Sequence, residues 1–272
     1  MSGQAKRVEL LPAKRRALVL ERLRRDGAAS LQELSREIKA SISTIRRDLE
    51  HLTAEGYLVR TYGGAVLVSD PLSTFEREPA KNVQFRHQQK AAIGKVAAER
   101  IEPGESVILD GSSTVHACAR ELSTRGIPLT AVTNSLDIAQ LCASCPDWRV
   151  YTLGGLVRPG WQMMYGEVAE TFLKTIHADI CIVGAYAVWE KALTDPSPEI
   201  ASLKRVMIKA ARRIILVIDS SKFRAPAFSE FATVEQIDEI ITDDGIAPEN
   251  LQTLRALNVK VTVVNVPDSE EG

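Results

Sequence analysis

The sequence predicts an α/β chain in two domains. A small helical domain with a β-wing is expected over residues 12–68, and a larger, mostly parallel α/β domain over residues 90–267. Residues 1–68 carry 13 Lys and Arg against 8 Asp and Glu, whereas the whole chain carries 34 against 35. Apolar residues recur at helical spacing in the first part, while Val/Ile-rich runs alternate with helical stretches in the second. Such a charge asymmetry indicates domains with different partners.

The first expected helix covers Ala13–Arg25. Ala17, Leu20 and Leu23 recur at helical spacing, basic residues occupy the other face, and Gly27 follows its end. The charge on this helix is therefore expected on an exposed surface.

The second expected helix begins at a capping box, in which Ser30 is followed three residues later by Glu33. Leu31, Leu34 and Ile38 then form one apolar face. A short turn separates this helix from the next, so the two are predicted to pack as a helix-turn-helix.

The third expected helix is capped by Ser41, and its apolar face consists of Ile45, Leu49 and Leu52. Gly56 is well suited to end it. Two short extended segments follow, 57–61 and 65–68, with paired glycines between them. Together these elements predict a winged helix-turn-helix.

The third helix of this fold can enter a DNA major groove. Arginine can bind guanine through two hydrogen bonds or clamp a phosphate, and hydroxyls and free N–H groups at a helix start suit phosphates. The alternative for the adjacent arginines is a solvated face paired with Asp48 or Glu50. The candidate DNA contacts are Ser41, Ser43, Thr44, Arg46, Arg47, Arg60, Tyr62 and Gly63.

Residues 12–67 resemble the DNA-binding domain of DeoR-type bacterial transcription regulators. The resemblance rests on the TIRRDL stretch at 44–49 and on four further positions or segments. Two departures are visible: the family commonly has His where this chain has Tyr62, and Val where it has Ala40. The resemblance implies binding to double-stranded DNA. The further positions are Leu52, Gly56, Arg60 and Gly63–Ala65.

Residues 69–89 lack a sustained apolar period and contain two prolines, so they are expected to form a linker. A helix is expected over Gln88–Arg100, and helical stretches separate most of the strands that follow. Continuous Val/Ile runs between helices indicate a parallel sheet covered on both faces. The expected strands are 106–110, 129–134, 149–155, 179–185, 213–219, 239–244 and 259–265.

Polar residues follow several of these strands, and ligands of parallel sheets bind beyond the carboxyl ends of strands. The Gly/Ser/Thr turn before the helix at 112–114 can cradle a phosphate. The next expected strand ends in Thr133 and Asn134, the one after it ends in Gly155 with Arg158 three residues on, and Lys222 follows a later strand. Turns before helices favour such residues in any case, but their joint placement predicts a small anionic ligand.

This second part resembles the effector domain of the same family, through "ILDGSST", "TNSLDIA", "LGGLVR", "LKRVMIKAARR" and "DSSKF". The resemblance implies a fold related to ribose-phosphate isomerases and CoA-transferases, and a phosphorylated sugar as ligand. Ser112 stands where the family commonly has Gly, and Ala192 where it often has Gly. The implied effector contacts are Asp110, Ser112, Ser113, Thr114, Thr133, Asn134, Gly155, Arg158, Lys204 and Lys222.

The leading interpretation is a ligand-controlled transcription regulator, a repressor that acts as a homodimer or homotetramer in the cytoplasm. The alternatives are a sugar-phosphate isomerase with an added DNA-binding domain and an architectural DNA-binding protein. An isomerase needs a positioned carboxylate base, and the stretch after the fourth expected strand has none.

No cofactor, metal or membrane segment is expected. The CxxC pair Cys142 and Cys145 is interpreted as two small residues near a helix end. His116 and His177 are interpreted as structural residues on helices, and the three tryptophans as packing or interface residues.

Arg47→Ala should weaken operator binding by roughly 1–3 kcal/mol and relax base preference at one position, because a bidentate contact to a base edge is lost. Arg60→Ala should instead weaken binding to all sequences alike and reduce the salt slope by about one. Titrations of operator and scrambled DNA at several salt concentrations measure both. Unchanged affinity in both variants would mean that the docking face is misassigned.

Overall fold

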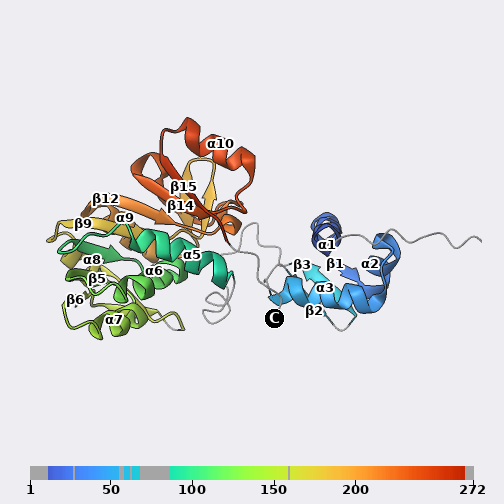
Figure 1. Cartoon of the computed structure of the whole chain (residues 1–272), viewed down its shortest axis with the longest axis horizontal. Coiled ribbons are helices and arrows are strands. Elements are labelled where there is room, and N and C mark those ends of the chain that lie inside the picture. The colour runs from blue at the N-terminus through green and yellow to red at the C-terminus, as the bar shows by residue number, and fades with distance from the viewer. Residues whose placement is uncertain are drawn as a thin grey trace, which may run out of the picture. The chain divides into compact units, whose positions relative to one another are not determined.

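The computed structural model describes residues 12–26, 28–54, 58–61, 63–67, 86–158 and 160–266. The chain divides into two units, Met1–Asp70 and Pro71–Gly272, which are described separately below. The α/β class predicted from the sequence is confirmed: a helical unit with a small sheet comes first, followed by a unit built on a seven-stranded parallel sheet (Figure 1).

The first unit contains the three expected helices, α1 (Pro12–Asp26), α2 (Leu31–Ile38) and α3 (Ile42–Ala54). The wing strands β2 (Leu58–Thr61) and β3 (Gly64–Leu67) pair antiparallel. A third strand, β1 (Ala28–Ser30), pairs with β3. The sequence analysis missed β1, because three small residues offer no apolar alternation to detect.

The core of this unit is formed by the apolar faces of α1, α2 and α3. One expectation was wrong: Ala17 is exposed, and Val19 and Leu23 are the fully buried residues of α1. Asp48 is also buried, and Arg15 of α1 binds it at 2.5 Å, which ties α1 to α3. The other buried apolar residues of the helices are Leu34, Ile38, Ile45, Leu49 and Leu52.

The predicted caps of α2 and α3 are both formed. The Ser30 hydroxyl accepts from the Glu33 N–H at 3.2 Å, and the Glu33 carboxylate accepts from the Ser30 N–H at 2.7 Å. At the start of α3, the Ser41 hydroxyl accepts from the Thr44 N–H at 3.1 Å. Gly56, which was expected to end α3, lies outside the described residues.

All seven expected strands of the second unit form one parallel sheet in the order β15-β14-β12-β9-β4-β5-β6. The order of the strands reverses between β4 and β9. The segments that follow these two strands therefore start from neighbouring points on the same edge of the sheet. The third strand ends at Thr152 rather than at 155. The strands are β4 (Ser106–Leu109), β5 (Leu129–Thr133), β6 (Trp148–Thr152), β9 (Ala178–Val183), β12 (Ala211–Val217), β14 (Glu239–Asp243) and β15 (Lys260–Val264).

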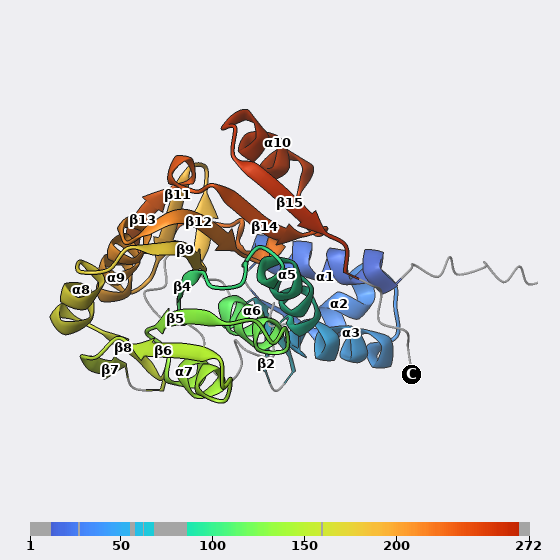
Figure 2. The same cartoon turned by 60° about the vertical axis from the view of Figure 1, so that its left-hand side comes forward.

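Helices cover both faces of this sheet, as Figure 2 shows. One core cluster joins α5 (His87–Ala98), α6 (Ser113–Ser123) and α7 (Leu136–Ala143) to one face. The other joins α8 (Glu167–Leu173), α9 (Pro198–Lys209) and α10 (Pro248–Ala256) to the opposite face. Successive strand residues alternate between the two clusters, which is why both sets of side chains are apolar.

Two small antiparallel features and two 3-10 turns were missed. A hairpin is formed by β7 (Leu156–Arg158) and β8 (Met163–Tyr165). A separate sheet contains β10 (Ala187–Trp189), β11 (Ala192–Asp195) and β13 (Ser229–Thr233). Most of these strands have three or four residues, too few for a period to emerge. The turns are η1 (Ser220–Lys222) and η2 (Val234–Gln236).

In the described part of the chain, no helix is long and apolar enough to cross a membrane.

His177, which was expected on a helix, lies in the exposed connection before β9.

Gly94→Ala should destabilise the second unit by about 1–3 kcal/mol, because α5 and α6 pack too closely for a side chain there. A Cβ at Gly94 would lie 2.7 Å from the backbone carbon of Ala117 and the backbone nitrogen of Cys118. Chemical denaturation measures the loss, and Lys95→Ala, at an exposed position of the same helix, is the control. Equal stability of the two variants would contradict the close packing.

Candidate functional site

A pocket opens at the carboxyl ends of the central strands, where the strand order reverses between β4 and β9. Its cavity volume is about 110 Å³, and it is open to solvent on one side. Its walls come from the segments after β4, β5, β9 and β12, together with the β7–β8 hairpin and α9. Open parallel sheets bind ligands at such a switch point.

The turn after β4 forms one wall of the pocket. Gly111–Thr114 line it, and Ser112 is the N-cap of α6. The Ser112 side chain makes no capping hydrogen bond, and within the described residues the buried Ser112 Oγ has no hydrogen-bond partner. A Cβ at Gly184 would lie 2.3 Å from that Oγ, so glycine is required where the chain leaves β9. Free N–H groups and hydroxyls at a helix start suit an anion.

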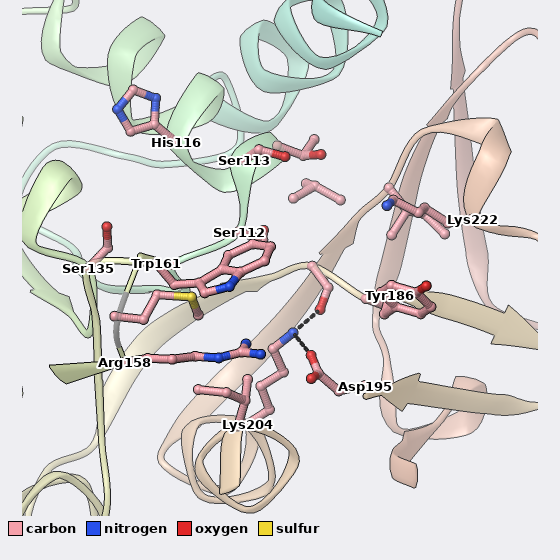
Figure 3. A pocket seen from close by; sticks show the side chains of 18 of the residues that line it. Ser112, Ser113, His116, Ser135, Arg158, Trp161, Tyr186, Asp195, Lys204 and Lys222 are labelled. Atoms are coloured by element: carbon pink, nitrogen blue, oxygen red, sulfur yellow. Dashed lines mark hydrogen bonds and ion pairs between the residues drawn. The ribbon is translucent and has the colours of Figure 1, made fainter. Parts of the chain in front are cut away.

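Lys204 brings a buried positive charge to the pocket from α9. Its ammonium donates to Asp195 Oδ2 at 2.9 Å and to the Gly184 carbonyl at 3.1 Å, as the dashed lines in Figure 3 show. Asp110 Oδ2 lies 3.7 Å away and accepts from the Gly184 N–H. All three charged side chains are buried, so Lys204 holds β4, β9 and β11 together as well as lining the pocket.

Lys222 lines the pocket from the end of η1. Its ammonium lies 5.8 Å from the ring centroid of Tyr186, which also lines the pocket and carries the Arg224 guanidinium at 4.0 Å. Asp219 starts the turn and is fully buried. Burial alone would raise the pKa of Asp219, but Lys222, the Ser221 hydroxyl, Arg86 and Lys90 outweigh it and lower that pKa.

The β7–β8 hairpin supplies Arg158 and Trp161 to the same pocket. The Arg158 guanidinium lies 5.0 Å from the Trp161 ring centroid, within range of a cation–π interaction. Figure 3 shows these two side chains entering from one side and Lys222 with Tyr186 from the other. Positive groups therefore come to the pocket from the hairpin, α9 and η1.

Six of the ten predicted effector contacts line the pocket, and four do not. The six are Ser112, Ser113, Thr114, Arg158, Lys204 and Lys222. Asp110 is fully buried, with its Oδ2 3.7 Å from the Lys204 ammonium. Thr133 Oγ1 donates to the Leu109 carbonyl, and the Asn134 amide nitrogen donates to the Met164 carbonyl at 3.4 Å. Gly155 has φ 114°, and a Cβ there would lie 2.4 Å from the Tyr165 carbonyl oxygen, so that position requires glycine.

Sequence reasoning missed several pocket residues. His116, interpreted as structural, lines the pocket, and burial lowers its pKa. Trp161 lines it too, although it was assigned to packing. The only sequence signal was proximity to predicted polar turns, and that signal does not show which side chains face inward. The remaining missed residues include Ser135, Asp137, Met163, Tyr186 and Asp195.

In the first unit, the predicted DNA-contacting face of α3 is exposed. Ser41, Ser43, Arg46 and Arg47 are exposed, and Thr44 is half-buried. The Ser41 hydroxyl hydrogen-bonds those of Ser43 and Thr44 at 2.9 and 2.7 Å.

The nearby carboxylate of Asp48 accepts hydrogen bonds from Arg15 of α1. Arg60 lies on β2 and Gly63 in the turn of the wing, whereas Tyr62 and the side chain of Arg60 lie outside the described residues.

In the CxxC pair, Cys142 is buried and Cys145 is half-buried. The described cysteines are free, and burial raises the pKa of Cys142 to about 12. Thiols with raised pKa values are poor nucleophiles and poor metal ligands. Within the described residues, no cluster of three potential metal ligands is found.

A winged-helix unit followed by a parallel α/β domain with a cationic pocket defines a DNA-binding protein with a ligand-binding domain. Comparison with known families gives the same class. Residues 15–70 match the DeoR-like helix-turn-helix domain, and residues 86–244 match the DeoR C terminal sensor domain. The chain belongs to the DeoR family and is a DNA-binding transcription regulator.

Curated relatives match along most of the chain. It is 33% identical to the putative aga operon transcriptional repressor of Escherichia coli O157:H7, over 93% of this chain and 94% of that protein. It is 31% identical to the HTH-type transcriptional repressor GlcR of Bacillus subtilis (strain 168), over 83% and 86%. The transcriptional repressor AccR of Agrobacterium fabrum (strain C58) is 33% identical, over 85% and 89%.

Solved structures match more distantly. Ribose 5-phosphate isomerase A from Methanocaldococcus jannaschii has a TM-score of 0.38 and 18% identity, over 50% of this chain and 54% of that chain. Translation initiation factor eIF-2B from Pyrococcus horikoshii OT3 has a TM-score of 0.45 and 14% identity, over 85% and 82%. Likenesses at this level carry no argument about function.

Lys204→Met should lower the free energy of unfolding by about 3–5 kcal/mol, because it leaves the buried carboxylate of Asp195 without its cation. Lys209→Met, at an exposed position of the same helix, should change stability by less than about 0.5 kcal/mol. Chemical denaturation of both variants measures the difference. A Lys204 variant as stable as the wild type would contradict a structural role for this ion pair.

Proposed function

We propose that the protein is a repressor whose DNA binding is controlled by a phosphorylated sugar bound in the pocket of the second unit. The observation that carries the proposal is the meeting of the Ser112–Thr114 helix start with Arg158, Lys204 and Lys222 around one pocket. The phosphate would contact the helix start and Lys222, since both favour an anion. Hydroxyls of the sugar would contact the other polar side chains that line the pocket.

Trp161 and Tyr186 add two aromatic rings to the pocket. Most ligand pockets combine apolar surface with a few fixed polar groups. The C–H faces of a sugar ring can pack on such aromatic surfaces, while its hydroxyls reach Ser135 or His116. A sugar phosphate therefore suits the pocket better than free phosphate, which would leave the aromatic surface unused.

The protein acts as a regulator and not as an isomerase. The segment 184–189, which follows β9, contains no carboxylate. Asp195 lines the pocket, but it is 2% exposed and accepts from Lys204 and from the Ser197 N–H. Both oxygens of this carboxylate already accept hydrogen bonds, so it is poorly placed to take a proton from a substrate. The relatives named above are repressors, which supports the same conclusion.

Control of DNA binding would follow from linkage. Effector and operator favour different states of the protein, so each weakens the binding of the other. A symmetric dimer or tetramer suits this role, because two winged helices can then occupy half-sites about one helical turn apart.

Arg158→Met should weaken sugar-phosphate binding about tenfold or more, because a charge-assisted contact is worth roughly 1.5–3 kcal/mol. Arg149→Met, at an exposed position of β6 outside the pocket, should bind as the wild type does. The ligand is the member of a sugar-phosphate panel that most raises the melting temperature. At a hundred times its dissociation constant it should add about 2.7 kcal/mol of stability.

Calorimetric titration of the wild type and both variants measures the affinities. Absence of a thermal shift with every sugar phosphate in a broad panel would overturn the proposal and favour an architectural DNA-binding protein. Equal loss of affinity in both variants would show that the effect of Arg158→Met is not specific to the pocket.

A further inference from the structure

A buried cluster of charges adjoins the pocket at the η1 turn. Asp219 is fully buried and Asp243 is 2% exposed, and both lie at the carboxyl ends of neighbouring strands, β12 and β14. The Ser220 hydroxyl donates to Asp243 Oδ1 at 2.8 Å, and the Ser220 N–H donates to Asp243 Oδ2 at 2.5 Å. The turn that carries Lys222 into the pocket is therefore fixed to the sheet through its first residue.

Arg86 reaches the same cluster from the start of α5. Its Nη1 donates to the Ser220 hydroxyl at 2.5 Å and lies 3.6 Å from Asp243 Oδ1, while its Nε lies 3.8 Å from Asp219 Oδ1. The same residue begins the helix: it has φ 52°, and its carbonyl accepts the first helical hydrogen bond, from the Lys90 N–H at 3.0 Å. One residue thus bonds both the helix start and the η1 turn.

Asp219 is shared between the pocket and α5. On the pocket side, Lys222 lies in the same turn as Asp219: its N–H donates to the Asp219 carbonyl at 3.0 Å, and its side chain lines the pocket. On the helix side, the Nε of Arg86, the N-cap of α5, lies 3.8 Å from Asp219 Oδ1. Lys222, Arg86 and Lys90 of α5 all lower the pKa of Asp219. Lys90 is itself buried, at 2% exposure. A buried carboxylate depends strongly on its counter-charges, since charges interact more strongly in a medium of low dielectric constant. When one of the three cations is drawn away, the buried carboxylate depends more on the other two.

We propose that Asp219, Ser220 and Arg86 form a relay that reports occupancy of the pocket to the first turn of α5, where the match to the sensor domain begins. The relay rests on the proposed function, because it assumes that the ligand carries an anionic group that binds Lys222. When an anion binds the Lys222 ammonium, less of that positive charge is available to Asp219. Arg86 then neutralises a larger share of the Asp219 charge. The Arg86 side chain is then held more tightly, and so is the helix start that it forms.

The sequence position of this helix start gives the relay its regulatory value. Arg86 is the first residue of the stretch that matches the sensor domain, and the match to the helix-turn-helix domain ends at residue 70. A change in the first turn of α5 is therefore a change at the end of the sensor domain that is nearest to the DNA-binding domain along the chain. An effector that contacts no residue of the first unit can bias DNA binding in this way.

Hydrogen exchange of the Lys90 amide tests the relay without any ligand, because that amide makes the first hydrogen bond of α5 to Arg86. Lys222→Met removes the pocket-side charge and should slow exchange of this amide at least threefold in the full-length protein. Lys209→Met, the same substitution at an exposed site on α9, should leave it unchanged. Should Lys222→Met fail to fold by circular dichroism, Lys222→Gln replaces it.

The Arg86→Met background identifies the route. There the Lys90 amide should exchange at the same rate whether position 222 is Lys or Met, and Arg86→Lys should restore part of the difference. Exchange in Lys222→Met that stays within twofold of the wild type, or becomes faster, would overturn the relay. A slowing that persists in Arg86→Met would overturn it too, because the effect would then travel by another path.

The failure of the relay and the failure of the proposed function give different results. Slower Lys90 exchange in Lys222→Met, together with no thermal shift from any sugar phosphate, would support the relay and overturn the proposed function. A clear thermal shift with unchanged Lys90 exchange would do the opposite.

Discussion

The parallel pairing of β4 with β5 on one side and β9 on the other is the constraint from which the site follows. The chain after β4 turns to one side of the sheet and the chain after β9 to the other, so a gap opens between them. The unpartnered Ser112 hydroxyl comes from one side of this gap and Gly184 from the other. The pairing of β4 with β9 thus brings together two segments that are distant in the sequence.

Buried charge then fixes the walls of the gap. Lys204 would be costly to bury alone, and Asp195, Asp110 and the Gly184 carbonyl make its burial tolerable. Removing one partner of a buried ion pair destabilises a protein by more than forming the pair stabilises it. This ion pair therefore fixes the positions of the strands more than it adds to the stability of the fold. Lys222 and Arg158 are only half-buried, so their charges cost the fold less than that of Lys204.

Helices and strands with a clear apolar pattern along the sequence were predicted, and short elements without such a pattern were missed. The seven Val/Ile-rich strands and the face of α3 were predictable, since each repeats one pattern over several residues. The β7–β8 hairpin was not, because three-residue strands carry no period. That omission also hid Trp161, which reaches the pocket only through the hairpin.

The predicted site residues show the same division. Ser112, Ser113 and Lys222 come soon after strands and line the pocket, because the carboxyl ends of parallel strands share one edge. Lys204 lies on α9 and was implied only by the family resemblance. Thr133 ends β5 and Asn134 follows it, yet both bond neighbouring backbone. Spacing in a sequence does not distinguish a side chain that faces a ligand from one that closes a turn. Arg86 gave no signal at all, since its partners lie more than a hundred residues away.

The central claim is that the pocket and the DNA-binding unit are coupled, and one measurement tests it most directly. The affinity for an operator fragment, selected from genomic DNA for binding to this protein, would be measured with and without the sugar phosphate that stabilises the second unit. The account predicts a change of about five- to 150-fold, the range of typical allosteric coupling. An operator affinity that is identical with the pocket empty and saturated would contradict it.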